Sequence, residues 1–133
     1  MPKGFEKFVE LTQEIIAASY EVHRILGPGL EERFYRNALI EELTLRGIKA
    51  VSEQVFPVHY KGKFIGKHQV DVIVEDKVSV EVKAVTGQLP NVHIAQTISE
   101  MNVCKLPVAL LVNFGDTSVQ VRRFENRDPS VNP

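Results

Sequence analysis

The sequence predicts a single α/β domain built on a mixed β-sheet that is flanked by helices. Three segments have helical apolar spacing, and the segments between them alternate with period two or are continuously apolar. The length of 133 residues, with 44% hydrophobic and 25% charged residues, is typical of one globular domain with its own core. We therefore expect one domain over residues 1–133, with its core at about 8–125 and a polar tail at 126–133 that frays.

Three segments are predicted to be amphipathic helices. The first covers residues 11–26 and ends at a Gly-Pro-Gly sequence, which cannot continue a helix cheaply. The second covers residues 30–46, and Gly47 follows it where a left-handed C-cap is expected. The third covers residues 91–105 and follows Pro90, because proline is tolerated near the first helical turn.

The other segments are predicted to be strands. Residues 51–60 are extended, but Pro57 disfavours a central, fully paired strand there. Residues 69–85 alternate around one break, 108–114 form a continuous apolar run typical of a buried strand, and 118–124 alternate as an edge strand would. The predicted order is therefore α-α-β-β-β-α-β-β.

The valines on either side of a turn predict the register of a β-hairpin, whose connection is the three residues 75–77 or a two-residue turn with a bulge. Both sets can be buried on one side of the sheet only if Val74 lies opposite Val78. This register places Asp71 opposite Glu81, with Lys83 two residues further on and all three on the other face. The alternating valines are Val70, Val72, Val74, Val78, Val80 and Val82.

Two opposed carboxylates and a lysine are a candidate metal site. Cβ atoms of opposed residues are roughly 4.5–5.5 Å apart, so Asp71 and Glu81 would repel unless a cation or a proton intervened. Mg²⁺ is held by one or two carboxylates with waters and phosphate oxygens, and a lysine can position water or neutralise charge on a phosphate. The alternative is a half-buried hairpin with a solvated charged face. Ile73 and Ala84 favour a covered face, where such groups are more often functional.

Two motifs resemble a known family. Asp71 with the Glu-Val-Lys sequence at 81–83 resembles the D…(D/E)-x-K motif of the PD-(D/E)XK nuclease superfamily. Residues 29–35 match G-x-x-E-x-x-Y, the pattern that names the bacterial GxxExxY protein family. The resemblance covers approximately residues 8–125 and implies a restriction-endonuclease-like αβββαβ core. Further similar segments follow in the same order at 74–78, 81–85, 95–96 and 112–115.

The resemblance implies a metal-dependent nuclease that hydrolyses phosphodiester bonds. Asp71 and Glu81 would bind Mg²⁺ or Mn²⁺, with the Val82 carbonyl as an extra ligand, and Lys83 would activate or position the water. DNA is favoured over RNA as the substrate. The small size of the chain, without a recognition module, suggests that a homodimer or a partner protein supplies specificity. The alternative is a non-catalytic module of the same fold that binds nucleic acid or protein.

Two further residues, Glu32 and Gln96, fit the site of the family, and each also has a local structural explanation. Glu32 would join the metal site from the helix before the sheet, although a first-turn glutamate is also favoured by the helix dipole. Gln96 would orient substrate or water, or be an ordinary polar helix position. The family often has an aromatic residue where this chain has Glu100, and proline where it has Val70. Glu100 adds negative charge where a phosphodiester would approach.

Composition excludes several classes of function. The net charge of -1 gives no attraction of the whole molecule to nucleic acid, although a local basic stripe is compatible with it. The four histidines have no pair at metal-ligand spacing, which disfavours zinc. The single Cys104 favours a reducing, intracellular compartment. We see no signal peptide and no long apolar run, so the expectation is a cytoplasmic protein without a membrane anchor.

Overall fold

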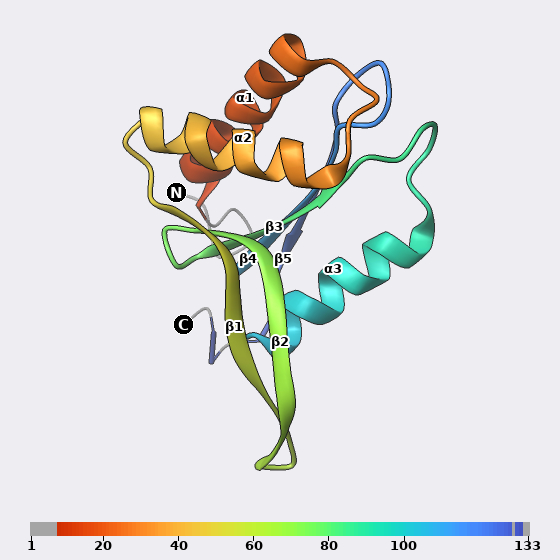
Figure 1. Ribbon diagram of the computed structural model, residues 1–133. Helices are drawn as coiled ribbons and strands as arrows, with labels where there is room; N and C mark the ends of the chain where they lie inside the picture. Colours follow the sequence, from red (N-terminus) through yellow and green to blue (C-terminus); the bar gives the residue numbers. More distant parts are fainter. Residues whose placement is uncertain (1–7, 129, 132–133) are drawn as a thin grey trace.

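The computed structural model describes residues 8–128 and 130–131, and its elements follow the predicted order (Figure 1). Gly47 has φ 76°, so the left-handed glycine expected after the second helix is confirmed. The elements are α1 (Val9–Leu26), α2 (Glu32–Leu45), β1 (Ala50–Tyr60), β2 (Lys63–Val74), β3 (Val78–Lys83), α3 (Asn91–Val103), β4 (Val108–Asn113) and β5 (Gln120–Glu125).

The five strands form one mixed sheet in the order β1-β2-β3-β4-β5. Strands β3 and β4 are parallel and the other neighbours are antiparallel. The parallel pair is connected through α3, as a parallel crossover requires. Strand β1, which contains Pro57, and strand β5 lie at the two edges, so both edge predictions are confirmed.

Helices cover both faces of the sheet. Helices α1 and α2 lie over one face, and α3 lies over the other (Figure 1). The larger core cluster joins α1 and α2 to the central strands and includes Ile15, Leu39 and Leu110, whose side chains are fully buried. A smaller cluster of buried residues (Val70, Ile73, Cys104 and Leu106) lies at the other face. The face that carries Ile73 is therefore covered, as predicted.

The predicted hairpin register is confirmed, with one exception among the valines. Val74 pairs with Val78 and Val72 with Val80, and the valines from 72 to 82 belong to the larger core. Val70 belongs instead to the smaller cluster. Regular pairing of β2 with β3 begins only at Val72, and Glu53, beside this point in β1, has φ 59° and falls outside the ladder. The regular alternation of side chains between the two faces of the sheet is therefore broken between Val70 and Val72.

Two segment boundaries differ from the prediction. Strand β2 begins at Lys63 rather than near residue 69, because pairing with β1 continues to the turn although residues 63–68 lack regular apolar alternation. The tail was expected to fray from residue 126, but Asn126 is 4% exposed and its amide donates to the carbonyl of Leu106 at 3.0 Å. The same expectation for residues 129, 132 and 133 lies outside the described residues. None of the described helices is long and apolar enough to cross a bilayer.

Candidate active site

The site lies where β2 separates from β3. The regular pairs of β2 and β3 end at Val72 and Val80. At the preceding residue of β2, the carboxylate of Asp71 accepts a hydrogen bond from β3 in place of a backbone carbonyl. Its Oδ2 atom accepts the backbone N–H of Val82 at 3.2 Å. A side chain thus replaces a backbone carbonyl, which holds Asp71 against β3 while the two strands diverge.

A cavity of about 410 Å³ opens at this divergence. Asp71, Glu81 and Lys83 line it together, whereas Val72, Val80 and Val82 belong to the core on the other side of the sheet. The prediction that the three charged residues share one face is therefore confirmed. The complete lining is His68, Gln69 and Asp71 from β2, Glu81 and Lys83 from β3, and Gln96, Ser99, Glu100 and Val103 from α3.

Glu81 and Lys83 form a largely buried ion pair. The Nζ atom of Lys83 lies 3.3 Å from Oε2 of Glu81, and the two side chains are 15% and 16% exposed respectively. The pKa of Glu81 is raised to about 7, chiefly by burial and further by the nearby carboxylates of Asp71 and Glu100, while Lys83 partly opposes the change. A carboxyl group in this state exchanges its proton for a cation readily near neutral pH.

Glu100 is paired across the cavity with His68, a contact that the sequence analysis missed. The Nε2 atom of His68 lies 2.7 Å from Oε2 of Glu100, whose side chain is 7% exposed. Burial raises the pKa of Glu100, although His68 opposes the change. Within the described residues its second oxygen, Oε1, is buried without a hydrogen-bond partner. Glu100 therefore contacts His68 through one of its two carboxylate oxygens at the wall of the cavity.

Asn113 fixes the chain that leaves the site, and its role was also missed. Its Oδ1 accepts the N–H of Val85 at 2.8 Å, and its Nδ2 donates to the carbonyl of Val85 at 2.8 Å. A Cβ atom on Gly115 would lie 2.3 Å from the Val85 nitrogen, so the two segments approach too closely for any other residue. One polar residue within the apolar run 108–114 was the available signal for this brace. It holds the end of β3 directly after Lys83.

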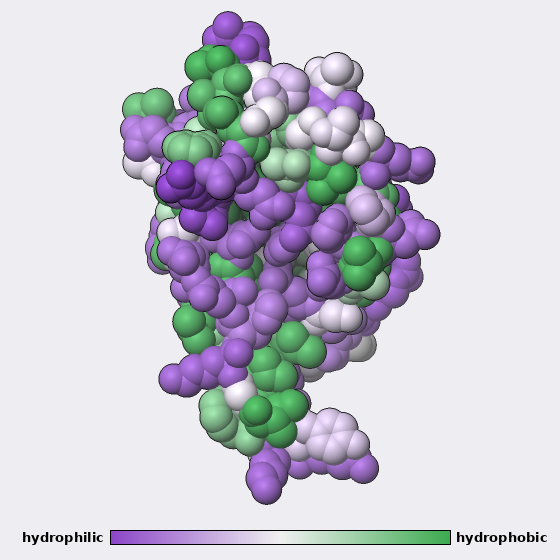
Figure 2. Space-filling view, turned by 45° about the vertical axis from the view of Figure 1, so that its right-hand side comes forward, coloured by the Kyte–Doolittle hydropathy of each residue, from purple (hydrophilic) through white to green (hydrophobic). Residues whose placement is uncertain are grey.

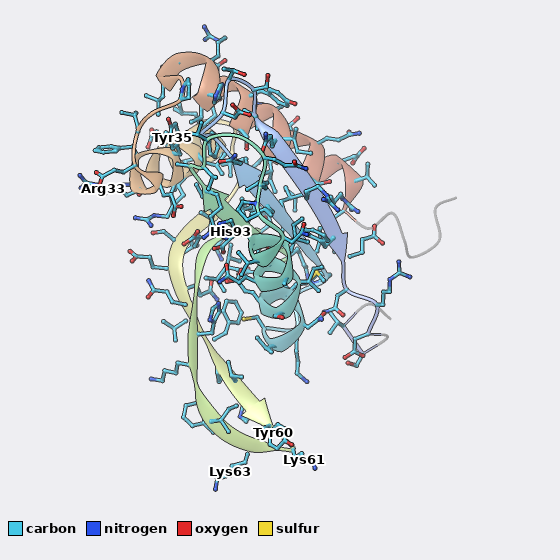
Figure 3. All side chains as sticks on the ribbon, turned by 90° about the vertical axis from the view of Figure 1, so that its right-hand side faces the viewer. Arg33, Tyr35, Tyr60, Lys61, Lys63 and His93 are labelled. Carbon is cyan, nitrogen blue, oxygen red and sulfur yellow. The ribbon has the colours of Figure 1, made fainter. Side chains whose placement is uncertain are left out.

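Gln96 reaches the cavity, whereas Glu32 does not. Gln96 is exposed on α3, and its Oε1 lies 3.3 Å from Nδ1 of His93, which Figure 3 shows near the start of that helix. Glu32 is the exposed first residue of α2, on the helical layer of the opposite face, and is not among the lining residues. A carboxylate in this position favourably interacts with the helix dipole.

The tyrosine of the G-x-x-E-x-x-Y pattern is structural. Tyr35 is fully buried, stacks on Phe114 with 4.9 Å between ring centroids, and donates its hydroxyl hydrogen to the carbonyl of Gly27 at 2.6 Å. The same hydroxyl accepts the N–H of Leu30 at 3.1 Å. Tyr35 therefore secures the turn between α1 and α2 to the end of β4.

The comparison with protein families agrees with this geometry. A family model described as the PD-(D/E)XK nuclease superfamily matches residues 9–124. The chain belongs to the PD-(D/E)XK nuclease superfamily. Neither the comparison with curated proteins nor that with solved structures found a match. Superfamily membership agrees with the five-stranded mixed sheet and with Asp71, Glu81 and Lys83 at one cavity, in the order of the superfamily motif.

Nucleases of this superfamily generally use divalent metals, and the side chains of Asp71 and Glu81 bring carboxylate oxygens to the cavity. Within residues 8–128 and 130–131, no group of three or more His, Cys, Asp or Glu side chains could hold a metal by itself. Mg²⁺ needs only one or two carboxylates, because waters and substrate phosphate oxygens complete its shell. The neighbouring carboxylates of Asp71 and Glu81, with the raised pKa of Glu81, would gain a counter-charge from such an ion.

Proposed function

We propose that this chain is a metal-dependent nuclease that hydrolyses phosphodiester bonds, with DNA as its preferred substrate. The observation that carries the proposal is the convergence of Asp71, Glu81 and Lys83 on one cavity at the point where two strands diverge. A loss of regular pairing creates space for a substrate, and the acidic and basic groups required for phosphodiester chemistry lie within it.

Asp71 and Glu81 would hold Mg²⁺ or Mn²⁺, with the carbonyl oxygen of Val82 as a further ligand. A bound ion of this kind polarises a phosphoryl oxygen and lowers the pKa of a coordinated water. The hydrogen bond that Asp71 accepts from the Val82 N–H supports this role, because it fixes the carboxylate at the edge of β3. Glu81 would contribute its carboxylate after losing the proton that its raised pKa favours.

Lys83 would position the attacking water and neutralise charge that develops on the phosphate. Its ammonium already lies within the cavity, 3.3 Å from Glu81, and Asn113 braces the chain that follows it. Gln96, which lines the same cavity, would orient substrate or water by its side-chain amide. Glu32, the exposed first residue of α2, does not line this cavity, so we assign it no part in the chemistry.

A cleavage assay tests the proposal. The purified 133-residue chain is incubated with supercoiled, linear double-stranded and single-stranded DNA and with RNA, in Mg²⁺, in Mn²⁺ and in EDTA. We expect metal-dependent cleavage of DNA that is lost in Asp71→Ala. Glu41→Ala, at an exposed position of α2, is the matched control and should cleave as wild type does. Cleavage that persists equally in Asp71→Ala or in EDTA would refute the proposal.

The second candidate is a non-catalytic module of the same fold that binds nucleic acid or protein. It is favoured by Glu100, which places a third carboxylate at the cavity, and by the net charge of -1. This candidate predicts no cleavage under any of the conditions above. Specificity supplied by a homodimer or a partner protein is compatible with either function.

A further inference from the structure

The hairpin of β1 and β2 extends beyond the rest of the molecule. We call residues 55–67 the hairpin arm. Its strands remain paired as far as Tyr60 and Lys63, and the arm projects away from the three helices (Figure 1). Tyr60, Lys61 and Lys63 stand at its far end (Figure 3). A two-stranded ribbon that contributes little to the core is available for contact with a partner.

The hairpin arm is basic although the whole chain is slightly acidic. Lys61, Lys63 and Lys67 are exposed, and residues 54–70 contain no aspartate or glutamate. Of the 16 Lys and Arg residues, 13 lie outside the arm with all 17 acidic residues, which gives a formal charge of -4 for the rest of the chain. The positive charge of the arm is therefore segregated from the acidic remainder, and favours a polyanionic partner.

Large apolar side chains accompany these lysines. Tyr60 is 62% exposed, Phe64 51% and Ile65 61%. The Nζ atom of Lys61 lies 5.6 Å from the centroid of the Tyr60 ring, within the range of a cation–π contact. Figure 2 shows apolar surface gathered over the arm at the bottom of the view. Clustered exposed apolar groups are typical of an interaction surface.

A second copy of the chain fits this surface less well than nucleic acid does. Two arms that met about a two-fold axis would bring their lysines together, and like charges disfavour such a contact. Pro57 has no N–H and so removes one backbone donor from β1, and the register shifts between Val58 and His59. Both features oppose the addition of another strand. A row of phosphates, in contrast, complements three lysines with no intervening acid.

We infer that the hairpin arm binds duplex DNA, with its two-stranded ribbon in the major groove and its lysines on the flanking phosphates. The inference rests on the proposed function for the choice of DNA. The major groove of B-DNA admits a two-stranded β-ribbon. Strand β2 continues from the arm to Asp71 in the cavity. The eight steps from Lys63 to Asp71 span about 26 Å at roughly 3.3 Å per residue, or about 8 base pairs.

The arm would therefore contact the duplex at a distance from the bond that is cut. Lysine contacts with phosphates position a protein without reading the sequence. Tyr60, Phe64 and Ile65 provide apolar side chains that can contact the base edges or thymine methyl groups in the groove. A small domain with a near-neutral total charge would thus hold a substrate through a local basic extension.

Binding measured without cleavage tests the inference. The wild-type chain, K61Q/K63Q/K67Q and the control K49Q/K77Q/K105Q are titrated with a fluorescent duplex of about 20 base pairs. Each triple variant removes three positive charges from exposed positions, and the control removes them outside the arm. Anisotropy in EDTA gives Kd at about 50 and 200 mM salt. Melting curves verify that all three proteins are folded.

The arm variant should weaken binding and reduce the salt dependence. Three lost phosphate contacts lower the slope of log Kd against log salt by about 2.7, because each contributes roughly 0.9. When salt increases fourfold, the factor by which Kd rises should therefore be roughly 40 times smaller for the arm variant than for the wild type. The slope for the control variant should differ from the wild-type slope by no more than about 0.9, which is the contribution of one phosphate contact.

Three results would overturn the inference: no duplex binding by the wild type, equal slopes in the arm variant and the wild type, or equal losses in the arm and control variants. Sedimentation of the same proteins checks the rival partner. A wild-type dimer that the arm variant dissociates, with the duplex slope unchanged, would assign the arm to self-association. Binding in EDTA is measured apart from metal-dependent cleavage. A protein that binds the duplex through the arm, but does not cleave it in Mg²⁺ or Mn²⁺, would therefore contradict the proposed function alone.

Discussion

Replacement of Glu81 by glutamine should stabilise the metal-free protein above neutral pH. The folded protein holds this carboxyl with a pKa of about 7, chiefly because the side chain is buried and also because Asp71 and Glu100 lie near it. The unfolded chain releases the same proton near the ordinary value of 4.5. Folding therefore favours the protonated form of Glu81. The contribution of this carboxyl to stability is fully present below pH 4.5 and is lost as the pH rises through 7.

The size of the effect follows from this difference in pKa. A rise from 4.5 to about 7 corresponds to roughly 3 kcal/mol at 1.36 kcal/mol per pH unit. The side chain is only 16% exposed, so screening by solvent leaves most of that value in place. Glutamine has nearly the shape of a protonated glutamate and cannot ionise. The variant should match the wild type near pH 4.5 and exceed it by roughly 3 kcal/mol near pH 8.

Urea unfolding in EDTA between pH 4.5 and 8.5 measures this difference. With a slope of about 2 kcal/mol per molar urea, the midpoint of Glu81→Gln should exceed that of the wild type by roughly 1.5 M at pH 8. Glu41→Gln removes a carboxylate from an exposed position of α2 and serves as the control. A difference between Glu81→Gln and wild type that stayed constant over this pH range would refute the reasoning about burial.

Three further substitutions separate chemistry from structure. Lys83→Ala should abolish hydrolysis in the cleavage assay but keep the rise in melting temperature on addition of Mn²⁺, because lysine is not a ligand; loss of both would contradict the assigned role. Tyr35→Phe removes the hydroxyl that binds Gly27 and Leu30, and urea unfolding should show a loss of about 1–3 kcal/mol with cleavage retained. Gly115→Ala should lower the melting temperature markedly, since the added Cβ would meet the backbone at 2.3 Å; an unchanged value would show that the loop shifts freely.

The regular elements and the central site could be predicted because they depend on local patterns. Helical spacing and alternating valines gave the element order, and the pairing of Val74 with Val78 followed from burying both valine sets. The same register brought Asp71, Glu81 and Lys83 to one face. Each of these conclusions needs only neighbouring residues and the periods of helices and strands.

Contacts between distant segments could not be predicted in this way. Residues 68 and 100 lie 32 positions apart, and the pairing of His68 with Glu100 depends on how α3 is seated over β2. The change of face at Val70 arises because β2 leaves β3 while it remains beside β1, a tertiary effect that alternation does not encode. Glu32 fitted a motif, but α2 places it on the other side of the sheet from the cavity.

Melting curves with and without Mn²⁺ test most directly the central claim, that Asp71 and Glu81 together hold a divalent ion. An ion that binds only the folded protein stabilises it by about 2.7 kcal/mol at a concentration 100-fold above Kd, which raises the melting temperature by roughly 10 °C in a domain of this size. We expect this rise in the wild type and in the control Asp76→Asn, which changes an exposed carboxylate in the hairpin turn. We expect most of the rise to be lost in Asp71→Asn. No rise in the folded, chelator-free wild type, or an equal rise in Asp71→Asn, would contradict the claim.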